Sequence, residues 1–136
     1  MVFSGLVRLP EAGFLKALQR ILRATLNTLN GLRAAASSEA AFRQEIFLLA
    51  LSIPLAILIA TDNRMRILLI VMVVTVMVVE LLNTAIEKLA DRVTLEHDPL
   101  IGRVKDMGSA AVGLTLMVAA LVWLFAIWQR IAALLG

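Results

Sequence analysis

The sequence contains no cysteine and a single histidine, His97, among its 136 residues. Without thiols, the chain has neither a disulfide framework nor a thiolate metal site. One imidazole is too few for a zinc site built from histidines. Aromatic residues make up only 5% of the chain, so its apolar character comes from aliphatic residues. A metal site in this chain would therefore rest on oxygen ligands.

The common glycine-rich motifs for phosphate binding are also missing. Neither G-x-x-x-x-G-K-[ST] nor the kinase-type G-x-G-x-x-G occurs, although Gly108 and Gly113 have the glycine spacing of the first motif. If the chain handles ATP, it uses none of the common nucleotide-binding folds. The two glycines would also permit close helix packing, but their five-residue spacing is not the small-xxx-small motif.

Hydrophobic residues account for 61% of the chain, and its mean hydropathy is +0.93. Soluble domains are about 45–50% apolar, so the composition indicates a membrane protein. The length allows one domain with about three spans of roughly 20 residues each. The net charge is +3 and the pI is about 10.2. Basic residues flank the apolar runs, which fits membrane topology better than nucleic-acid binding.

Hydrophobic periodicity predicts an all-α chain. Residues 1–10 are expected to be flexible, and residues 11–136 to form a single membrane domain. An amphipathic helix is predicted over about 11–35, with its basic face toward lipid headgroups; an ordinary helix packed on protein is the alternative. The predicted spans cover about 40–60, 66–91 and 107–130.

Local signals refine the helix ends. Ser37 and Ser38 are expected to cap the first span, and Pro54 is tolerable inside a membrane helix. A polar loop is predicted over 93–105, with Asp106 or Ser109 opening the third span. The positive-inside rule places the N-terminus and this loop in the cytoplasm, and the C-terminus outside. The residues behind that assignment are Arg33, Arg43, Lys88, Arg92, Arg103 and Lys105.

The most informative segment is ELLNTAIE at residues 80–87, because it ends the apolar run 67–79. An unpaired charge in a membrane helix costs roughly 2.5–3.5 kcal/mol on insertion scales. Glu80, Asn83, Glu87 and Asp91 share one helix stripe. The alternatives are a hydrogen bond or salt bridge to Lys105 for Glu80, and plain surface charges for Glu87 and Asp91.

Acids from several segments should meet at the cytoplasmic boundary. Glu39 and Glu45 open the first span, Glu80 and Glu87 end the second, and Lys105 precedes the third. Carboxylates without soft donors suit Mg²⁺, which takes one or two of them together with substrate phosphates. Phosphoryl transfer to a lipid hydroxyl is one hypothesis. A non-enzymatic ion-binding or assembly subunit is the other.

Four motifs resemble those of the bacterial integral-membrane diacylglycerol kinases. They are GLRAA at 31–35, EAAFRQE at 39–45, ELLNTAIE at 80–87 followed by Asp91-Arg92, and GRVKDMGSAA at 102–111. Their order and spacing match without gaps, from about Arg20 to Trp128. The related undecaprenol kinases share the second-span motif and Lys105-Asp106, whereas 39–45 is more similar to the diacylglycerol branch.

The resemblance implies an ATP- and Mg²⁺-dependent kinase that converts diacylglycerol to phosphatidate in the bacterial inner membrane. It also implies three transmembrane helices, an N-terminal surface helix and a homotrimer with active sites shared between subunits. Undecaprenol kinase activity is the closest alternative. The implied partners are diacylglycerol, ATP and membrane lipids, with no nucleic acid.

The resemblance assigns roles to residues of this chain. Glu80 would be the general base and Asn83 would support it, while Glu39 and Glu87 would ligate Mg²⁺. The residues on the nucleotide side would be Arg20, Glu39, Glu87, Glu96, His97, Asp98, Lys105 and Asp106. Those on the lipid side would be Arg33, Phe42, Arg43, Glu45, Glu80 and Ser109. His97 and Asp98 stand where the family has a Tyr-His pair, and residues 1–19 have no counterpart.

Overall fold

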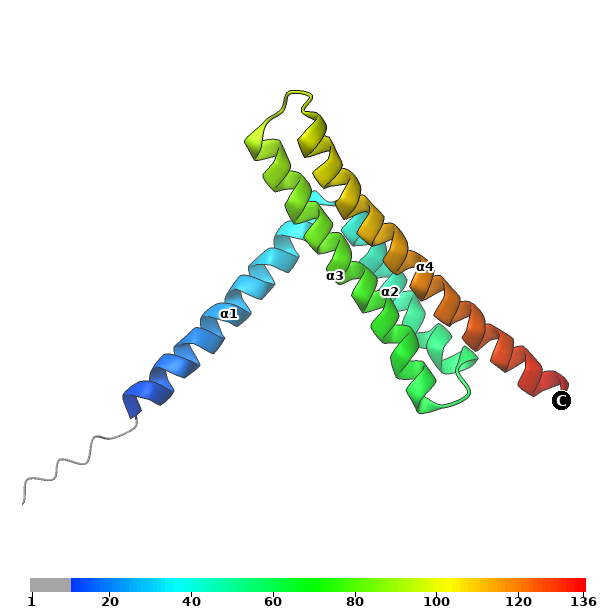
Figure 1. The fold of residues 1–136 in the computed structure, drawn as a ribbon. Helices are drawn as coiled ribbons and strands as arrows, with labels where there is room; N and C mark the ends of the chain where they lie inside the picture. Colours follow the sequence, from blue (N-terminus) through cyan, green and yellow to red (C-terminus); the bar gives the residue numbers. More distant parts are fainter. Residues whose placement is uncertain (1–10) are drawn as a thin grey trace, which may run out of the picture. The chain divides into compact units, whose positions relative to one another are not determined.

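The computed structural model describes residues 11–136, which form four α-helices and, within that range, no strand. The helices are α1 (Glu11–Ser38), α2 (Ala40–Ile59), α3 (Asn63–Val93) and α4 (Pro99–Leu135), as labelled in Figure 1. Helices α2, α3 and α4 are each long and apolar enough to cross a membrane. The all-helical prediction with three spans is therefore confirmed. The predicted flexible segment 1–10 lies outside the described residues.

The chain divides into two compact units, one ending at Ser38 and the other covering Glu39–Gly136. In the first unit, α1 is a single helix whose threonines bond within it: Thr25 and Thr28 each donate to the carbonyl four residues earlier, at 3.0 Å. Large apolar side chains recur along α1 and are exposed, among them Phe14, Leu18 and Ile21.

The predicted serine cap of α2 is wrong. Ser37 and Ser38 belong to the last turn of α1, where both hydroxyls donate to the Ala34 carbonyl, at 2.9 and 3.0 Å. Serine hydroxyls inside a helix commonly bond back to the carbonyl three or four residues earlier, so both serines are part of α1 and not a cap of the next helix. Glu39 occupies the N-cap position of α2 with an extended backbone, and its side chain makes no capping hydrogen bond. Its carboxylate instead forms an ion pair with Lys88 of α3.

Asp62 starts α3 after a short connection from α2. Its Oδ1 accepts hydrogen bonds from the backbone N–H groups of Arg64 at 2.8 Å and Met65 at 3.0 Å. Such bonds satisfy N–H groups that have no partner within the helix. The Met65 N–H, followed by the Arg64 N–H, holds the pKa of Asp62 below its usual range. Asp62 is thus a structural acid.

The third membrane helix begins earlier than predicted. It starts at Pro99, not at Asp106 or Ser109, because Asp98 caps it. Asp98 Oδ1 accepts from the N–H groups of Leu100 at 2.7 Å and Ile101 at 3.3 Å. Proline at the first helical position loses no intrahelical bond and has a suitable φ. The predicted polar loop is therefore only the short connection between α3 and α4.

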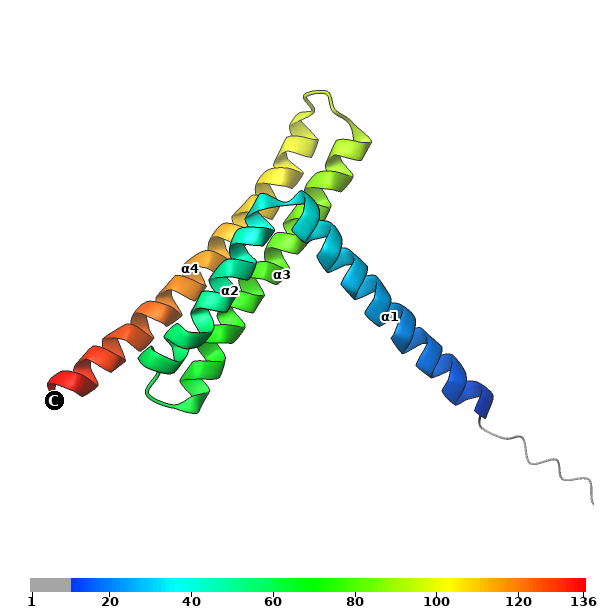
Figure 2. The same ribbon diagram turned by 180° about the vertical axis from the view of Figure 1, so that it is seen from behind.

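In the second unit, α3 packs most extensively on α4, while α2 packs mainly on α3. Figures 1 and 2 show the three helices side by side, with α3 and α4 continuing past the start of α2 toward their connection. A tight cluster of Ala56, Ala60, Leu69 and Ala126 closes the opposite end of this bundle. The fold therefore separates an apolar, closely packed end from an end that carries the acids.

The buried residues of α3 recur at every seventh position: Leu69, Val76, Asn83 and Ala90. The buried residues of α4 are all small, namely Gly108, Ala119 and Ala126. Small residues let membrane helices approach closely. Asn83 is the polar member of the α3 stripe. A polar side chain thus occupies a position where the other three are apolar.

Most apolar side chains of the three spans face outward. In the most hydrophobic stretches of α2, α3 and α4, only 17%, 17% and 11% of the residues are buried. A single soluble chain would not leave so much apolar surface in water. The surface suits a lipid bilayer or further protein chains.

Candidate active site

Four glutamates gather around the start of α2 and the C-terminal half of α3. The Glu80 carboxylate lies within electrostatic range of Glu45, and also of Glu87 and Glu39. All four side chains are partly buried. The local sequence explains the arrangement, because Glu39 and Glu45 lie at the N-terminal end of α2, which packs against α3. Ionised carboxylates this close repel one another, and a bound cation would relieve that repulsion.

Glu39 contacts α3 through an ion pair. Its Oε1 lies 2.7 Å from Lys88 Nζ. The Glu39 side chain is 28% exposed and the Lys88 side chain 57% exposed, so the pair stands at the edge of the cluster, not in its interior. This contact holds Glu39 beside the helix that carries Glu80 and Glu87.

Asn83 lies between the two glutamates of α3 and is 8% exposed. Its Nδ2 donates to Glu87 Oε1 at 3.1 Å. Its Oδ1 is buried and accepts no hydrogen bond from the residues that the structure describes. The predicted grouping of Glu80, Asn83 and Glu87 is thus observed on one helix, with Asn83 bonded directly to Glu87.

Some of the residues that the resemblance assigns to the nucleotide line one hollow at the α3–α4 connection. Lys105 Nζ lies 2.5 Å from Asp91 Oδ1, so its observed partner is Asp91 and not Glu80. These two residues line a hollow of about 340 Å³ together with Thr94, Leu95, Glu96, His97, Asp98, Ile101 and Gly102. Asp106 is exposed on the first turns of α4 and does not line it.

A second, apolar hollow runs along the bundle from Glu45. It has a volume of about 290 Å³ and is lined by Glu45, Ser52 and Trp123 among mostly aliphatic side chains. The Glu45 Oε2 atom is buried and finds no hydrogen-bond partner among the described residues. Ser52 donates to the Leu49 carbonyl at 2.8 Å. The hollow is therefore a mostly apolar groove with one carboxylate in its lining.

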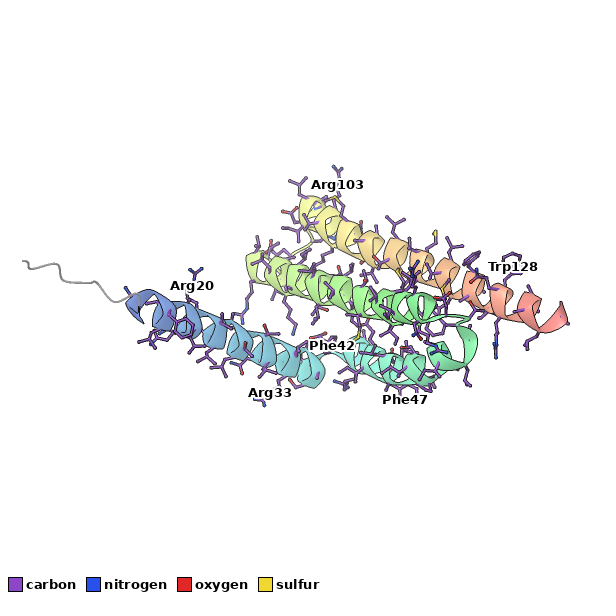
Figure 3. The ribbon with its side chains drawn as sticks, turned by 90° about the horizontal axis from the view of Figure 1, so that it is seen from below. Arg20, Arg33, Phe42, Phe47, Arg103 and Trp128 are labelled. Carbon is purple, nitrogen blue, oxygen red and sulfur yellow. The ribbon has the colours of Figure 1, made fainter. Side chains whose placement is uncertain are left out.

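Sequence reasoning missed two lining residues of this hollow. Ser52 is a polar residue inside an apolar span, and that signal could have singled it out. Trp123 fits an aromatic belt by its place in the sequence, but in the fold it lines the hollow and packs against the apolar cluster. Trp128, labelled in Figure 3, remains 63% exposed as a belt residue would.

The remaining predicted lipid-side residues differ in their surroundings. Phe42 is 3% exposed and packs inside the unit, whereas Phe47 on the same helix is 68% exposed (Figure 3). Arg43 and Ser109 are exposed. Arg20 and Arg33 are exposed on α1, in the other unit, and their roles stay predictions.

The acid cluster offers carboxylate oxygens as ligands for Mg²⁺. Within the described part of the chain, no three acidic or histidine side chains stand close enough together to hold a metal ion. Mg²⁺ commonly takes only one or two protein carboxylates and completes its shell with water and phosphate oxygens. Two partly buried carboxylates, Glu39 and Glu87, near the common neighbour Glu80 fit that requirement.

Comparison with known proteins points to a single protein family. The sequence profile of prokaryotic diacylglycerol kinase matches residues 26–127. A diacylglycerol kinase of Escherichia coli strain K12 is 46% identical over 111 residues, which cover 82% of this chain and 91% of that protein. One from Pseudomonas aeruginosa is 46% identical over 106 residues, 78% of this chain and 86% of the relative. One from Helicobacter pylori strain 26695 is 38% identical over 108 residues, 79% and 84% of the two chains. The chain therefore belongs to the prokaryotic diacylglycerol kinase family.

Proposed function

We propose that this protein transfers the γ-phosphoryl group of ATP to the free hydroxyl of diacylglycerol, which gives phosphatidate and ADP. One structural observation supports this proposal in addition to family membership. The acid cluster around Glu80 includes Glu45, which also lines the apolar hollow. A water-soluble anion and an acyl chain can therefore reach the same carboxylates from different sides.

Glu80 is the proposed general base. Its carboxylate takes the proton of the lipid hydroxyl, whose oxygen attacks the γ-phosphorus as the bond to the ADP oxygen breaks. The Glu45 carboxylate and the hollow orient the glycerol and one acyl chain. Phe42, Arg43 and Ser109, with Arg33 of α1, belong to the proposed lipid side.

The nucleotide occupies the other side. Glu39 and Glu87 are the proposed Mg²⁺ ligands, and Asn83 holds Glu87 through the observed 3.1 Å bond. Bound Mg²⁺ supplies charge neutralisation at the phosphates. Lys105 and Asp106 engage the nucleotide, and Glu96, His97 and Asp98 contact it with Arg20 of α1. Asp98 Oδ1 already caps α4, so the proposed contact uses its second oxygen.

The proposal includes a homotrimer whose subunits share active sites. The largely outward-facing apolar surface of α2, α3 and α4 supports further protein contacts. We also propose that α1 lies on the membrane surface. Its exposed leucines recur at helical spacing, and its lysine and arginines lie between them in the sequence. The N-terminus would be cytoplasmic, the C-terminus periplasmic, and the acid cluster at the cytoplasmic face of the inner membrane.

The decisive experiment measures lipid phosphorylation directly. Purified protein in mixed micelles receives radiolabelled ATP, Mg²⁺, and diacylglycerol and undecaprenol at equal surface concentration. Labelled phosphatidate as the main product is expected. Preferential labelling of undecaprenol would replace the proposal with undecaprenol kinase activity. The absence of any labelled lipid, in protein that is folded, would favour a non-enzymatic subunit.

A further inference from the structure

Gly108 lies opposite Asn83 where α4 packs on α3, and its missing side chain makes room for the asparagine amide. A β-carbon at position 108 would stand 2.2 Å from Asn83 Oδ1 and 3.3 Å from Asn83 Cγ. The first distance is far shorter than any van der Waals contact. Gly108 is itself buried, and the backbone fixes where the added atom stands, so the clash must be relieved by movement of Asn83 or of the helices.

The clash involves the tip of a side chain and not the backbone. The Asn83 Cα would remain 4.0 Å from the added carbon, which is ordinary contact. A methyl group at position 108 would therefore displace the amide first and leave the helix spacing almost unchanged. Position 108 thus controls where the Asn83 amide can lie.

The amide has two ends with different tasks. Its Nδ2 donates to Glu87 Oε1 at 3.1 Å, and this bond needs the nitrogen, because two oxygens would repel each other. Its Oδ1 then lies against Gly108 without another hydrogen-bond partner among the described residues. A glycine Cα–H is a weak donor that suits such an oxygen. The pocket at Gly108 therefore selects the orientation that presents the amide nitrogen to Glu87.

We infer that Gly108 is a positioning residue of the active site: it holds the Asn83 amide in the one pose that orients the Glu87 carboxylate toward Mg²⁺ and the ATP phosphates. The inference rests on the proposed function for the role of Glu87. The contact itself between Gly108 and Asn83 can be tested without turnover.

The test compares Gly108→Ala with Gly113→Ala, on the same helix, where a β-carbon would meet nothing within 4 Å. A hydrogen bond to a charged group is worth enough to change affinity on the order of 10- to 100-fold. We expect Gly108→Ala to weaken binding of a non-hydrolysable ATP analogue with Mg²⁺ by about tenfold or more, measured by calorimetry. The KM for Mg·ATP should rise while the KM for diacylglycerol stays within about twofold. Gly113→Ala should resemble the parent protein in both.

A spectroscopic readout separates the geometry from the chemistry. In protein with ¹⁵N-labelled asparagine, Gly108→Ala should shift the side-chain amide signal of Asn83, and Gly113→Ala should not. An unshifted signal would overturn the inference even if the protein proves to be a kinase. A shifted signal without lipid kinase activity in the parent would keep the contact and remove the proposed function.

A double variant tests whether Gly108 acts through Asn83. In the Asn83→Ala background, Gly108→Ala should cause little additional loss of nucleotide affinity. If Gly108→Ala lowered nucleotide affinity as much in the Asn83→Ala background as in the parent protein, Gly108 would act independently of Asn83. If Gly108→Ala alone fails to fold, the double variant, which lacks the clashing atoms, should fold. A double variant that is equally unfolded would show that position 108 limits helix packing and would overturn the inference.

Discussion

Lys88 Nζ lies 2.7 Å from Glu39 Oε1 and so joins the start of α2 to the C-terminal half of α3. Glu39 is one of the two proposed Mg²⁺ ligands, and Lys88 therefore competes with the metal for the same carboxylate. The pair also keeps Glu39 close to α3. The role of Lys88 can therefore be measured through the Mg²⁺ dependence of activity.

Lys88→Gln should lower the Mg²⁺ concentration needed for half-maximal activity. An exposed ion pair contributes little, so the expected change is about two- to fivefold. The measurement is a Mg²⁺ titration at saturating ATP. Lys88→Arg keeps the charge and should behave like the parent protein. An increased Mg²⁺ requirement in Lys88→Gln would mean that the lysine orients Glu39 for the metal and does not compete with it.

Glu80→Gln should lower kcat on the order of 100- to 10,000-fold, because an amide cannot accept the hydroxyl proton. Thermal unfolding in detergent should change little, since the two side chains have similar shape. Thr75→Val is the matched control on the same helix, because the Thr75 hydroxyl donates within α3, to the Val71 carbonyl at 2.8 Å. Near-normal turnover of Glu80→Gln would remove Glu80 as the general base.

The membrane orientation can be tested on a clean background, because the chain contains no cysteine. Thr61→Cys places a thiol in the α2–α3 connection, and Leu95→Cys places one in the α3–α4 connection. In intact cells an impermeant thiol reagent should label the first variant only, and both after permeabilisation. Labelling of Leu95→Cys alone in intact cells would reverse the proposed topology.

Asp62→Ala should lower the unfolding temperature in detergent, because the two hydrogen bonds to the start of α3 are lost. The folded-state pKa of Asp62 lies below its usual range, chiefly because the Met65 N–H donates to it. Its contribution to stability is therefore complete above the ordinary aspartate pKa of about 4 and is lost as the pH falls through the lower folded value. The difference between Asp62→Ala and the parent should shrink on acidification below about pH 4. Thr61→Ala, with the cap intact, should show no such pH dependence.

The helices and the acid-bearing segments could be predicted because their signals are local. Long apolar runs define the spans, and Glu80, Asn83 and Glu87 share one helix stripe whatever the helix packs against. The helix ends were less certain, because several polar residues compete for each cap. Asp98, followed by Pro99, starts α4 where Asp106 or Ser109 could have started it. Glu39 occupies the N-cap position of α2 that Ser37 or Ser38 could have occupied.

Contacts between helices could not be predicted in the same way. They depend on how far α4 is shifted along α3, which no short sequence pattern encodes. Gly108 and Gly113 look equivalent as sequence, yet only Gly108 is buried, against Asn83. The pairing of Lys105 with Asp91 and the hollow between Glu45 and Trp123 likewise follow from this alignment.

The seven-residue recurrence of Leu69, Val76, Asn83 and Ala90 also has a consequence for the register of the two helices. A seven-residue recurrence is typical of a coiled-coil seam, in which a partner helix moved by one heptad meets similar positions again. Such a shift of α4 would bring Ile101 or Thr115 opposite Asn83 in place of Gly108, and both carry side chains where the amide needs space. A single buried polar residue is a well-attested means of fixing coiled-coil alignment. The space that Asn83 needs beside α4 therefore disfavours these two shifted alignments.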